Sequence, residues 1–490
     1  MPTVTERKAS PAPSGRGRSR LLGLVASEQA DSAARRHLAV AALFLVVAVF
    51  LGLLTFFQAR TPGLGSAFLA YGRVRPMYTN AAIFGWLGLG GMSVVYYLTP
   101  RLTGVRLWGE SLANANLWLS VLAYAVGIAS LGLGLTDGRT LLEFPLWLDP
   151  VVAVTLAVPA LVVTRTVARG RERNLYVSLW YLLAAPWWGL LLYLAGNLPG
   201  LSGVGSAVQN WFFAGNVLGL WLAGLAVGAA YYVVPKATGN PLHSHALALV
   251  GFWSLAFTQP WTGQSGAVHG PGPDWLETVA IVFSVALLIP ILAVVANLAA
   301  TMRGEWEMLD TSFALRFALL GAVSYVLVGV MGAFQATRSA ASVIGLTPWE
   351  EGTFSLALFG VLTSFVASFI YYAWPRLIGR DWFRFSLGEW HFRLTAGGVL
   401  VMTVALWAAG LISGYNWAAG ASTGAFANTG EGFAQSLAGV GFFSFLATLG
   451  MAAVSLGQGL FVFHLYRTYT SGPAIAQEML VTVDREPEVG

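Results

Sequence analysis

From about residue 38 to residue 468 the chain alternates long apolar stretches with short polar segments. A helix needs ~20 predominantly apolar residues to cross ~30 Å of hydrocarbon, and each apolar stretch is roughly that long. The pattern therefore predicts an all-α integral membrane protein with twelve spans, at 38–59, 79–98, 112–136, 147–169, 174–196, 206–234, 245–263, 275–301, 312–336, 350–374, 391–413 and 436–468.

Composition agrees with this pattern. Hydrophobic residues make up 56% of the chain and charged residues 10%, and the mean hydropathy is +0.67, values that place it outside the soluble classes. The 57 glycines are expected to let helix backbones approach closely. No soluble domain and no clear repeat is evident. We predict a basic, disordered tail over 1–36, a membrane domain over 37–470 and a C-terminal tail over 471–490.

Basic residues indicate the orientation, because cytoplasmic loops are enriched in Lys and Arg. Alternate loops carry Arg101, Arg106, Arg169, Arg171, Arg173, Lys236, Arg303, Arg376, Arg380 and Arg384, whereas the loops 197–205, 263–274 and 414–435 carry none. Both termini are therefore predicted to be cytoplasmic, in a multi-pass protein of a bacterial-type inner membrane. The exceptions on the other side need an anionic partner or a headgroup; they are Arg60, Arg73, Arg75, Arg139 and Arg338.

The net charge of +5 does not indicate a nucleic-acid partner, because the cations stand where topology requires them. The lipid bilayer is the partner that composition establishes. The chain has no cysteine, which excludes disulfides, iron–sulfur clusters, thiolate haem ligation and covalent c-type haem.

Several motifs carry a resemblance to a known family. They are Gly72-Arg-Val-Arg-Pro-Met-Tyr-Thr-Asn80, Tyr231-Tyr-Val-Val-Pro-Lys236, Gly251-Phe-Trp253, Trp261-Thr-Gly263, Pro273-Asp-Trp275, Gly304-Glu-Trp306, Leu315-Arg-Phe317, Tyr371-Tyr-Ala-Trp-Pro-Arg376 and Trp390-His-Phe392. In order and spacing the chain resembles subunit I of the haem-copper oxidases, and within that superfamily the C-type or cbb-type cytochrome c oxidases. The resemblance covers roughly residues 38 to 468.

The resemblance implies a twelve-helix bundle that binds a low-spin haem, a high-spin haem and a copper ion through histidine, whose neutral imidazole suits both metals. Carried over position by position, the second-span haem ligand falls on Tyr78. The copper ligands fall on Gly215, Ser265 and Gly266, and the two tenth-span haem ligands fall on Thr353 and Ser355. None of the six positions holds a histidine.

The residues around these ligands also depart from the family pattern. The seventh-span tyrosine falls on Gln259, the ninth-span glutamate on Met331 and a twelfth-span arginine on Ser436, while Arg73 and Arg75 still resemble partners of haem propionates. The six histidines present lie elsewhere: His37, His391 and His464 near cytoplasmic span ends, His243 and His245 in a cytoplasmic loop, and His269 in a loop on the other side. His391 is expected to pack or hydrogen-bond structurally.

Tyr78 has two interpretations. A tyrosinate can hold a haem iron, or the residue is an ordinary tyrosine at the level of the headgroups. We predict that the chain binds neither haem nor copper and does not catalyse by itself. It would be a pseudoenzyme, a non-catalytic subunit or scaffold of the respiratory chain that associates with a c-type cytochrome or other oxidase subunits. The alternatives are a divergent oxidase or nitric oxide reductase with unusual ligation, and a channel or carrier that uses the vacated cavity.

Overall fold

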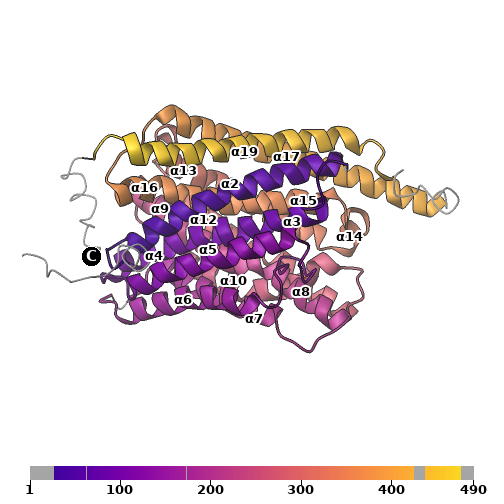
Figure 1. Ribbon diagram of the computed structural model, residues 1–490, viewed down its shortest axis with the longest axis horizontal. Helices are drawn as coiled ribbons and strands as arrows, with labels where there is room; N and C mark the ends of the chain where they lie inside the picture. The colour runs from indigo at the N-terminus through magenta and orange to yellow at the C-terminus, as the bar shows by residue number, and fades with distance from the viewer. Residues whose placement is uncertain (1–26, 62, 173, 424–435, 476–490) are drawn as a thin grey trace, which may run out of the picture.

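The computed structural model describes residues 27–61, 63–172, 174–423 and 436–475, which form a bundle of long helices running side by side (Figure 1). The predicted tail segments 1–26 and 476–490 lie outside the described residues. The helices are α2 (Ser32–Arg60), α3 (Tyr71–Asn80), α4 (Leu89–Thr103), α5 (Glu110–Gly132), α6 (Asp149–Ala168), α7 (Val177–Gly196), α8 (Val204–Asn216), α9 (Ala223–Thr238), α10 (His245–Thr258), α11 (Asp274–Ala286), α12 (Leu288–Thr301), α13 (Phe313–Gln335), α14 (Arg338–Ile344), α15 (Pro348–Ser355), α16 (Ser364–Ile378), α17 (Phe385–Thr423) and α19 (Val440–Ser471).

Shorter helical segments of other kinds interrupt or join these helices. Three are π-helical, η1 (Ala81–Gly88), η2 (Val217–Leu222) and η5 (Leu356–Thr363), and two are 3₁₀-helical, η3 (Gln259–Ala267) and η4 (Trp306–Asp310). The all-helical membrane fold predicted from the sequence is confirmed.

Among the described residues, eleven helices are long and apolar enough to cross a membrane. The predicted span 245–263 is divided between α10 and η3, which together run from His245 to Ala267. Pro260 stands at the second position of η3 and has no amide hydrogen, so the α-helical hydrogen-bond pattern cannot continue through it. The seventh predicted span is thus part α-helix and part 3₁₀-helix.

Three of the spans form the centre of the bundle. In their most apolar windows, 100% of the residues in Tyr71–Thr103 are buried inside the protein, and 89% in both Val204–Thr238 and Pro348–Ile378. The corresponding share in the other spans is 33% to 56%. A helix that is apolar on every face packs in the interior, so these three spans are surrounded by the rest.

The three central spans share a local design that the sequence reading missed. Each contains a π-helical segment, and each ends in the pattern Tyr-Tyr-x-x-Pro-basic-x-x-Gly, which begins at Tyr96, Tyr231 and Tyr371. The final glycine of each copy, Gly104, Gly239 or Gly379, has a positive φ and ends the helix. The expectation of no clear repeat is therefore wrong, because the similarity lies in a short pattern at a fixed place in each span.

Both described ends of the chain lie at one end of the bundle, which we call the terminal face; the other end is the opposite face. Helix α2 begins at Ser32, so residues 32–36, assigned to the tail by sequence, are helical. They are fixed because Asp31 forms an ion pair with Arg101, with two nitrogen–oxygen distances of 2.9 Å. The guanidinium of Arg101 also stacks on the ring of Tyr97.

Candidate functional site

Four of the six positions that the resemblance assigns to metal ligands lie beside the π-helical segments of the three central spans, and the other two, Ser265 and Gly266, lie in η3. Tyr78 precedes η1, Gly215 precedes η2, and Ser355 directly precedes η5. A π-helical turn widens the helix and often occurs at functional sites. We call Tyr78, Thr353 and Ser355 the haem-side positions, and Gly215, Gln259, Ser265 and Gly266 the copper-side positions.

Backbone contacts close the copper-side position Gly215. A Cβ atom placed on Gly215 would lie 2.6 Å from the Cα atom of Gly263 and 3.2 Å from its carbonyl oxygen. A Cβ atom placed on Gly263 would lie 2.9 Å from the Cα atom of Phe212. Helix α8 and the 3₁₀ segment η3 therefore touch through their main chains. Neither position has room for even a methyl group, and a metal ligand would need a larger side chain.

Gln259 fills the adjoining space. Its Nε2 atom donates hydrogen bonds to the carbonyl oxygen of Gly215 and to Oγ1 of Thr262, both at 3.0 Å. Its side-chain amide lies where a Cβ atom of Gly219 would stand. A buried amide needs such partners, so Gln259 acts as a clamp between η3 and the end of α8.

The two remaining copper-side positions lie further along η3. Ser265 is partly exposed. A Cβ atom on Gly266 would lie 2.6 Å from the ring of Trp211. This glycine is thus covered by an indole, and a side chain at its position would have to displace the ring.

At the haem-side position Tyr78 the contacts are made by the side chain and not by the main chain. The residue is 1% exposed, so the expectation of a tyrosine at the headgroups is wrong. Its ring packs near Gly52 and Met451, where a Cβ on Gly52 would meet Met451 Cε at 2.6 Å and Tyr78 Cε2 at 3.0 Å. The hydroxyl is buried and has no hydrogen-bond partner among the described residues. Tertiary packing places this ring inside because α2 and α19 cover it.

The haem-side positions on α15 differ from one another. Oγ1 of Thr353 donates to Oε1 of Gln335 at 3.1 Å and accepts a hydrogen bond from Nε1 of Trp407 at 3.2 Å. Ser355 is fully buried, and within the described part of the chain its hydroxyl has no partner. Two of the three haem-side positions thus carry a buried, unpaired hydroxyl, which is unusual in proteins.

Of the two arginines that the resemblance places near haem propionates, one pairs with a carboxylate of this chain. Arg75 forms an ion pair of 3.0 Å with Glu351 at the start of α15. Arg73 donates instead to the carbonyl oxygen of Gly132 at 2.9 Å. The charge that a propionate would supply to Arg75 is therefore supplied from within the chain.

Glu143 lies in the loop between α5 and α6 on the same face. Its Oε2 atom accepts a hydrogen bond of 2.7 Å from Nδ2 of Asn80. Burial raises the pKa of Glu143, and the hydrogen bond from Asn80 and the charge of Arg75 offset only part of that rise. This carboxyl therefore holds a proton more readily than an exposed glutamate does.

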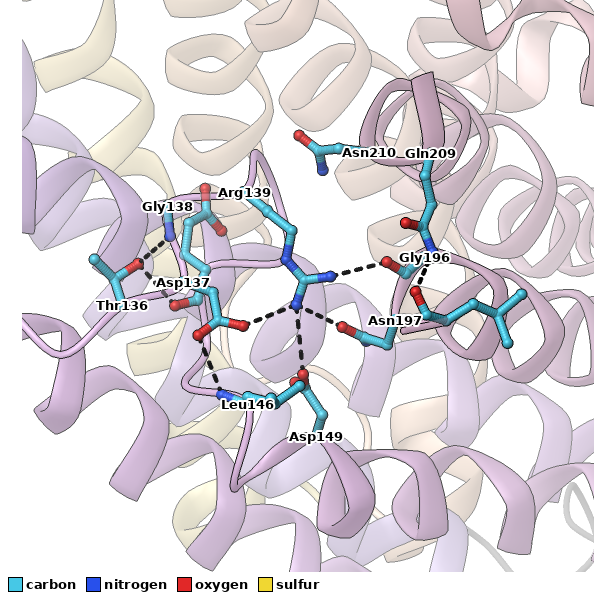
Figure 2. Close-up of polar contacts among 12 residues, drawn as sticks. Thr136, Asp137, Gly138, Arg139, Leu146, Asp149, Gly196, Asn197, Gln209 and Asn210 are labelled. Atoms are coloured by element: carbon cyan, nitrogen blue, oxygen red, sulfur yellow. Dashed lines mark hydrogen bonds and ion pairs between the residues drawn. The ribbon is translucent and has the colours of Figure 1, made fainter. Parts of the chain in front are cut away.

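Arg139 organises a second polar cluster in this loop, shown in Figure 2. It donates to Asn197 Oδ1 at 2.7 Å and to the Gly196 carbonyl oxygen at 2.9 Å, and it pairs with Asp137 at 2.9 Å and Asp149 at 3.6 Å. These contacts fasten the loop to α6 and α7 (Figure 2). The expectation that a basic residue on this face needs an anionic partner is confirmed for Arg139, as for Arg75.

Three of the histidines within helices pack as buried structural residues, whereas His245, which the sequence places in a loop, is the exposed first residue of α10. The hydroxyl of Tyr371 and Nδ1 of His391 lie 2.9 Å apart, within hydrogen-bond distance, and the imidazole stacks on Phe461 with 4.4 Å between ring centroids. His37 and His464 are also buried. The structural role expected for His391 is confirmed. Among the described residues, no three His, Asp or Glu side chains gather closely enough to hold a metal ion.

Two further positions depart from the family pattern in ways that packing explains. Met331 packs against a small apolar cluster of Ala340, Ile344 and Trp349. Ser436 is 2% exposed, and its carbonyl oxygen accepts a hydrogen bond from Asn416 at 3.2 Å. The sequence did not indicate the roles of Gln259, Glu351 and Glu143, because each depends on a contact with a residue distant in the chain.

Comparison with known proteins supports the resemblance. The sequence profile described as Cytochrome C and Quinol oxidase polypeptide I matches residues 32–453. The chain is 28% identical to cytochrome c oxidase subunit 1 of Rhodobacter capsulatus, over 78% of this chain and 76% of that protein. It is 26% identical to the Cbb3-type cytochrome c oxidase subunit CcoN1 of Stutzerimonas stutzeri, over 71% of this chain and 76% of that protein. A solved heme-copper terminal oxidase dimer shares the fold, with a TM-score of 0.76, 13% identity and coverage of 91% and 84%.

Proposed function

Because the chain belongs to the family of cytochrome c and quinol oxidase polypeptide I, we propose that it is a subunit I-like membrane protein that no longer holds the family's metals. It would act as a non-catalytic subunit or scaffold in a respiratory membrane complex. The other members of that complex would be a c-type cytochrome or further oxidase subunits, in a bacterial inner membrane with both termini in the cytoplasm. The relatives named as oxidase subunits support this setting.

The contact between Gly215 and Gly263 carries the proposal. A copper site of this family needs imidazoles that project from α8 and from the segment occupied by η3. Here the two main chains are in contact, with no space for a Cβ atom at either glycine. Gln259 bridges the two segments and uses its amide to satisfy the carbonyl oxygen of Gly215. Restoring a ligand at Gly215 would thus require these segments to separate.

The chemistry of the donor set supports the same conclusion. The haem-side and copper-side positions offer hydroxyls, an amide and glycines, and neutral hydroxyl and amide groups are poor ligands for haem iron or copper compared with imidazole. The residues present do not fit the family's copper. At the haem side, Glu351 also supplies the negative charge next to Arg75 that a propionate would supply.

Spectroscopy and metal analysis test the proposal directly. The chain would be purified in mild detergent beside the Rhodobacter capsulatus relative, expressed and handled in the same way as a control for haem supply. We expect the relative to show a Soret band and stoichiometric iron and copper, and this chain to show neither. A stoichiometric haem in this chain, with oxygen or nitric oxide reduction, would establish the divergent-enzyme alternative instead.

Association is tested on native membranes. Affinity purification of the tagged chain should recover a c-type cytochrome or another oxidase subunit in fixed ratio. If the chain is isolated alone and also lacks metals, the scaffold proposal is wrong. The structure gives little support to a carrier: a cavity among α2, α4, α5 and α6 measures about 10 Å³, and no haem-side or copper-side residue lines it. Such a volume holds about one water molecule.

A further inference from the structure

Three arginines lie on the terminal face, where α16 ends, α17 begins and α19 ends; the C-terminal end of α19 is at the upper left of Figure 1. They are Arg380, Arg384 and Arg467, and we call them the arginine surface. The guanidinium groups of Arg384 and Arg467 both lie against the ring of Phe383, at 5.3 and 4.6 Å from its centroid. The guanidinium of Arg380 donates to the carbonyl oxygen of Thr470 at 3.0 Å. Aromatic and main-chain contacts thus hold the three cations in one place.

These cations have no carboxylate partner within the described part of the chain. The neighbouring ion pairs use Arg316 and Arg393, both with Glu389. The one nearby acid, Asp381, accepts a hydrogen bond from the amide of Trp382. Arg101 elsewhere on this face shows the usual arrangement, because Asp31 neutralises it. The arginine surface therefore has uncompensated positive charge.

The described chain ends beside this surface. After α19, residues 472–475 run antiparallel to residues 379–381, with a bridge between Arg380 and Ala474. The amide of Asp381 donates to the carbonyl oxygen of Pro473 at 2.8 Å, and the amide of Ile475 donates to that of Gly379 at 3.1 Å. The described chain therefore ends at Ile475, beside Gly379 and Arg380.

The following sequence complements the surface in charge. Residues 476–490 contain Glu478, Asp484, Glu486 and Glu488 against a single basic residue, Arg485. An extended chain covers at most ~3.6 Å per residue, so these acids can all reach the arginine surface. Between them lies the apolar run Met479–Val483, and Phe385 beside the surface is 52% exposed.

We propose that residues 476–490 bind the arginine surface of the same chain. Carboxylates of the tail pair with Arg380, Arg384 and Arg467, and the apolar run packs on Phe385. Bidentate guanidinium–carboxylate geometry and a network of several charges are the conditions under which exposed ion pairs contribute measurably to binding.

Site-directed spin labelling tests this proposal. The chain has no native cysteine, so only the introduced cysteine takes the label. A nitroxide on the variant Thr482→Cys would be followed by electron paramagnetic resonance in nanodiscs of phosphatidylcholine. We expect most of the label to be immobilised, and the immobilised fraction to fall several-fold in Arg380→Gln/Arg384→Gln/Arg467→Gln. Neutralising the tail acids with Gln or Asn should have the same effect, as should ~1 M salt, where the screening length is ~3 Å.

Two further variants keep the test decisive. Arg165→Gln/Arg169→Gln/Arg171→Gln removes the same charge from exposed positions at the end of α6 on this face, and it should leave the label immobilised. Arg384→Gln/Arg467→Gln retains the contacts of Arg380 if the triple variant does not fold. Equal mobility with and without the arginines would overturn the proposal. So would release of the label in discs containing phosphatidylglycerol, because headgroups would then be the occupant.

Discussion

The copper-side and haem-side positions, where the resemblance places the family's ligands, are filled in two different ways. At the copper side the main chains of α8 and η3 have closed on each other, and Gln259 bonds across the junction. At the haem side the space between spans is filled by side chains, and the hydroxyls of Tyr78 and Ser355 are buried without partners. The Gln259 amide nitrogen at the copper side thus has hydrogen-bond partners, whereas two of the three haem-side hydroxyls have none among the described residues.

This difference indicates which region contributes stability. Tight contacts and complete hydrogen bonding make a region costly to change. A buried hydroxyl without a partner costs free energy, and its removal should cost nothing. If the chain is a scaffold, its copper side serves as ordinary protein core, and its haem side retains groups that no longer improve the packing.

The largest expected effect follows from Gly215→Ala. Its Cβ would meet Gly263 main-chain atoms that cannot rotate away, so we expect a loss of about 3 kcal/mol or more in the free energy of unfolding. Thermal unfolding in detergent, followed by tryptophan fluorescence, measures it. Gly332→Ala is the matched control, because a Cβ there meets nothing within 4 Å and should be neutral or stabilising. Equal behaviour of the two variants would mean that the copper side is not closed.

Gln259→Leu should have the next largest effect. The substitution keeps the side chain's approximate volume but removes the donor to the carbonyl oxygen of Gly215. We expect a loss of about 1–3 kcal/mol, measured in the same assay. Ordinary surface substitutions change stability by less than about 0.5 kcal/mol. A loss that small would argue against Gln259 holding η3 and α8 together.

Tyr78→Phe tests the haem side and should act in the opposite direction. Because the hydroxyl has no partner among the described residues, its removal should leave stability unchanged or raise it by up to about 1 kcal/mol. Tyr193→Phe provides the contrast, since that hydroxyl donates to Asp149 at 2.6 Å, and its loss should destabilise. If Tyr78→Phe lowers the stability as much as Tyr193→Phe does, the Tyr78 hydroxyl has a hydrogen-bond partner outside the described residues.

Glu351→Gln should have a small effect. The pair with Arg75 is partly exposed, with 46% of the arginine side chain and 25% of the glutamate side chain accessible, so we expect a loss of about 0.5 kcal/mol. The difference from the unmodified chain should shrink in high salt. Glu350→Gln, whose carboxyl instead accepts from the amide of Leu346, should show no comparable salt dependence. A salt-independent effect of Glu351→Gln would argue against an electrostatic role.

Glu143→Gln should alter mainly the pH dependence. Burial raises the folded-state pKa of this carboxyl, so between its unfolded and folded pKa values the folded state binds more protons. Stability therefore falls as the pH rises through that interval and is lowest above it. The amide variant can still accept from Asn80 and should lack this slope, with a difference of about 1 °C in melting temperature at neutral pH. Parallel curves from pH 4.5 to 8 would contradict the shift.

Sequence reasoning predicted the all-helical membrane fold and the family, because both depend on local features. Hydrophobic length defines each span, and motifs such as the one around Tyr78 fix the register of the resemblance. Sequence reasoning was wrong where the result depends on contacts with residues distant in the chain. Tyr78 looked interfacial because it stands near a span end, yet α2 and α19 cover it. The repeated terminal pattern could have been found by aligning the spans that begin at 71, 204 and 348.

The sequence by itself determined that this chain is a polytopic helical membrane protein of the oxidase subunit I type, without histidine at the six expected positions. Those properties follow from composition, apolar length and residue identity, which need no partner in space. Only the tertiary structure decided that Gly215 and Gly263 touch, that Glu351 pairs with Arg75, and that Ile475 ends beside Arg380. The reason is physical. Packing and ion pairing join residues far apart in the chain, and a local sequence pattern does not specify which distant segment will pack against it.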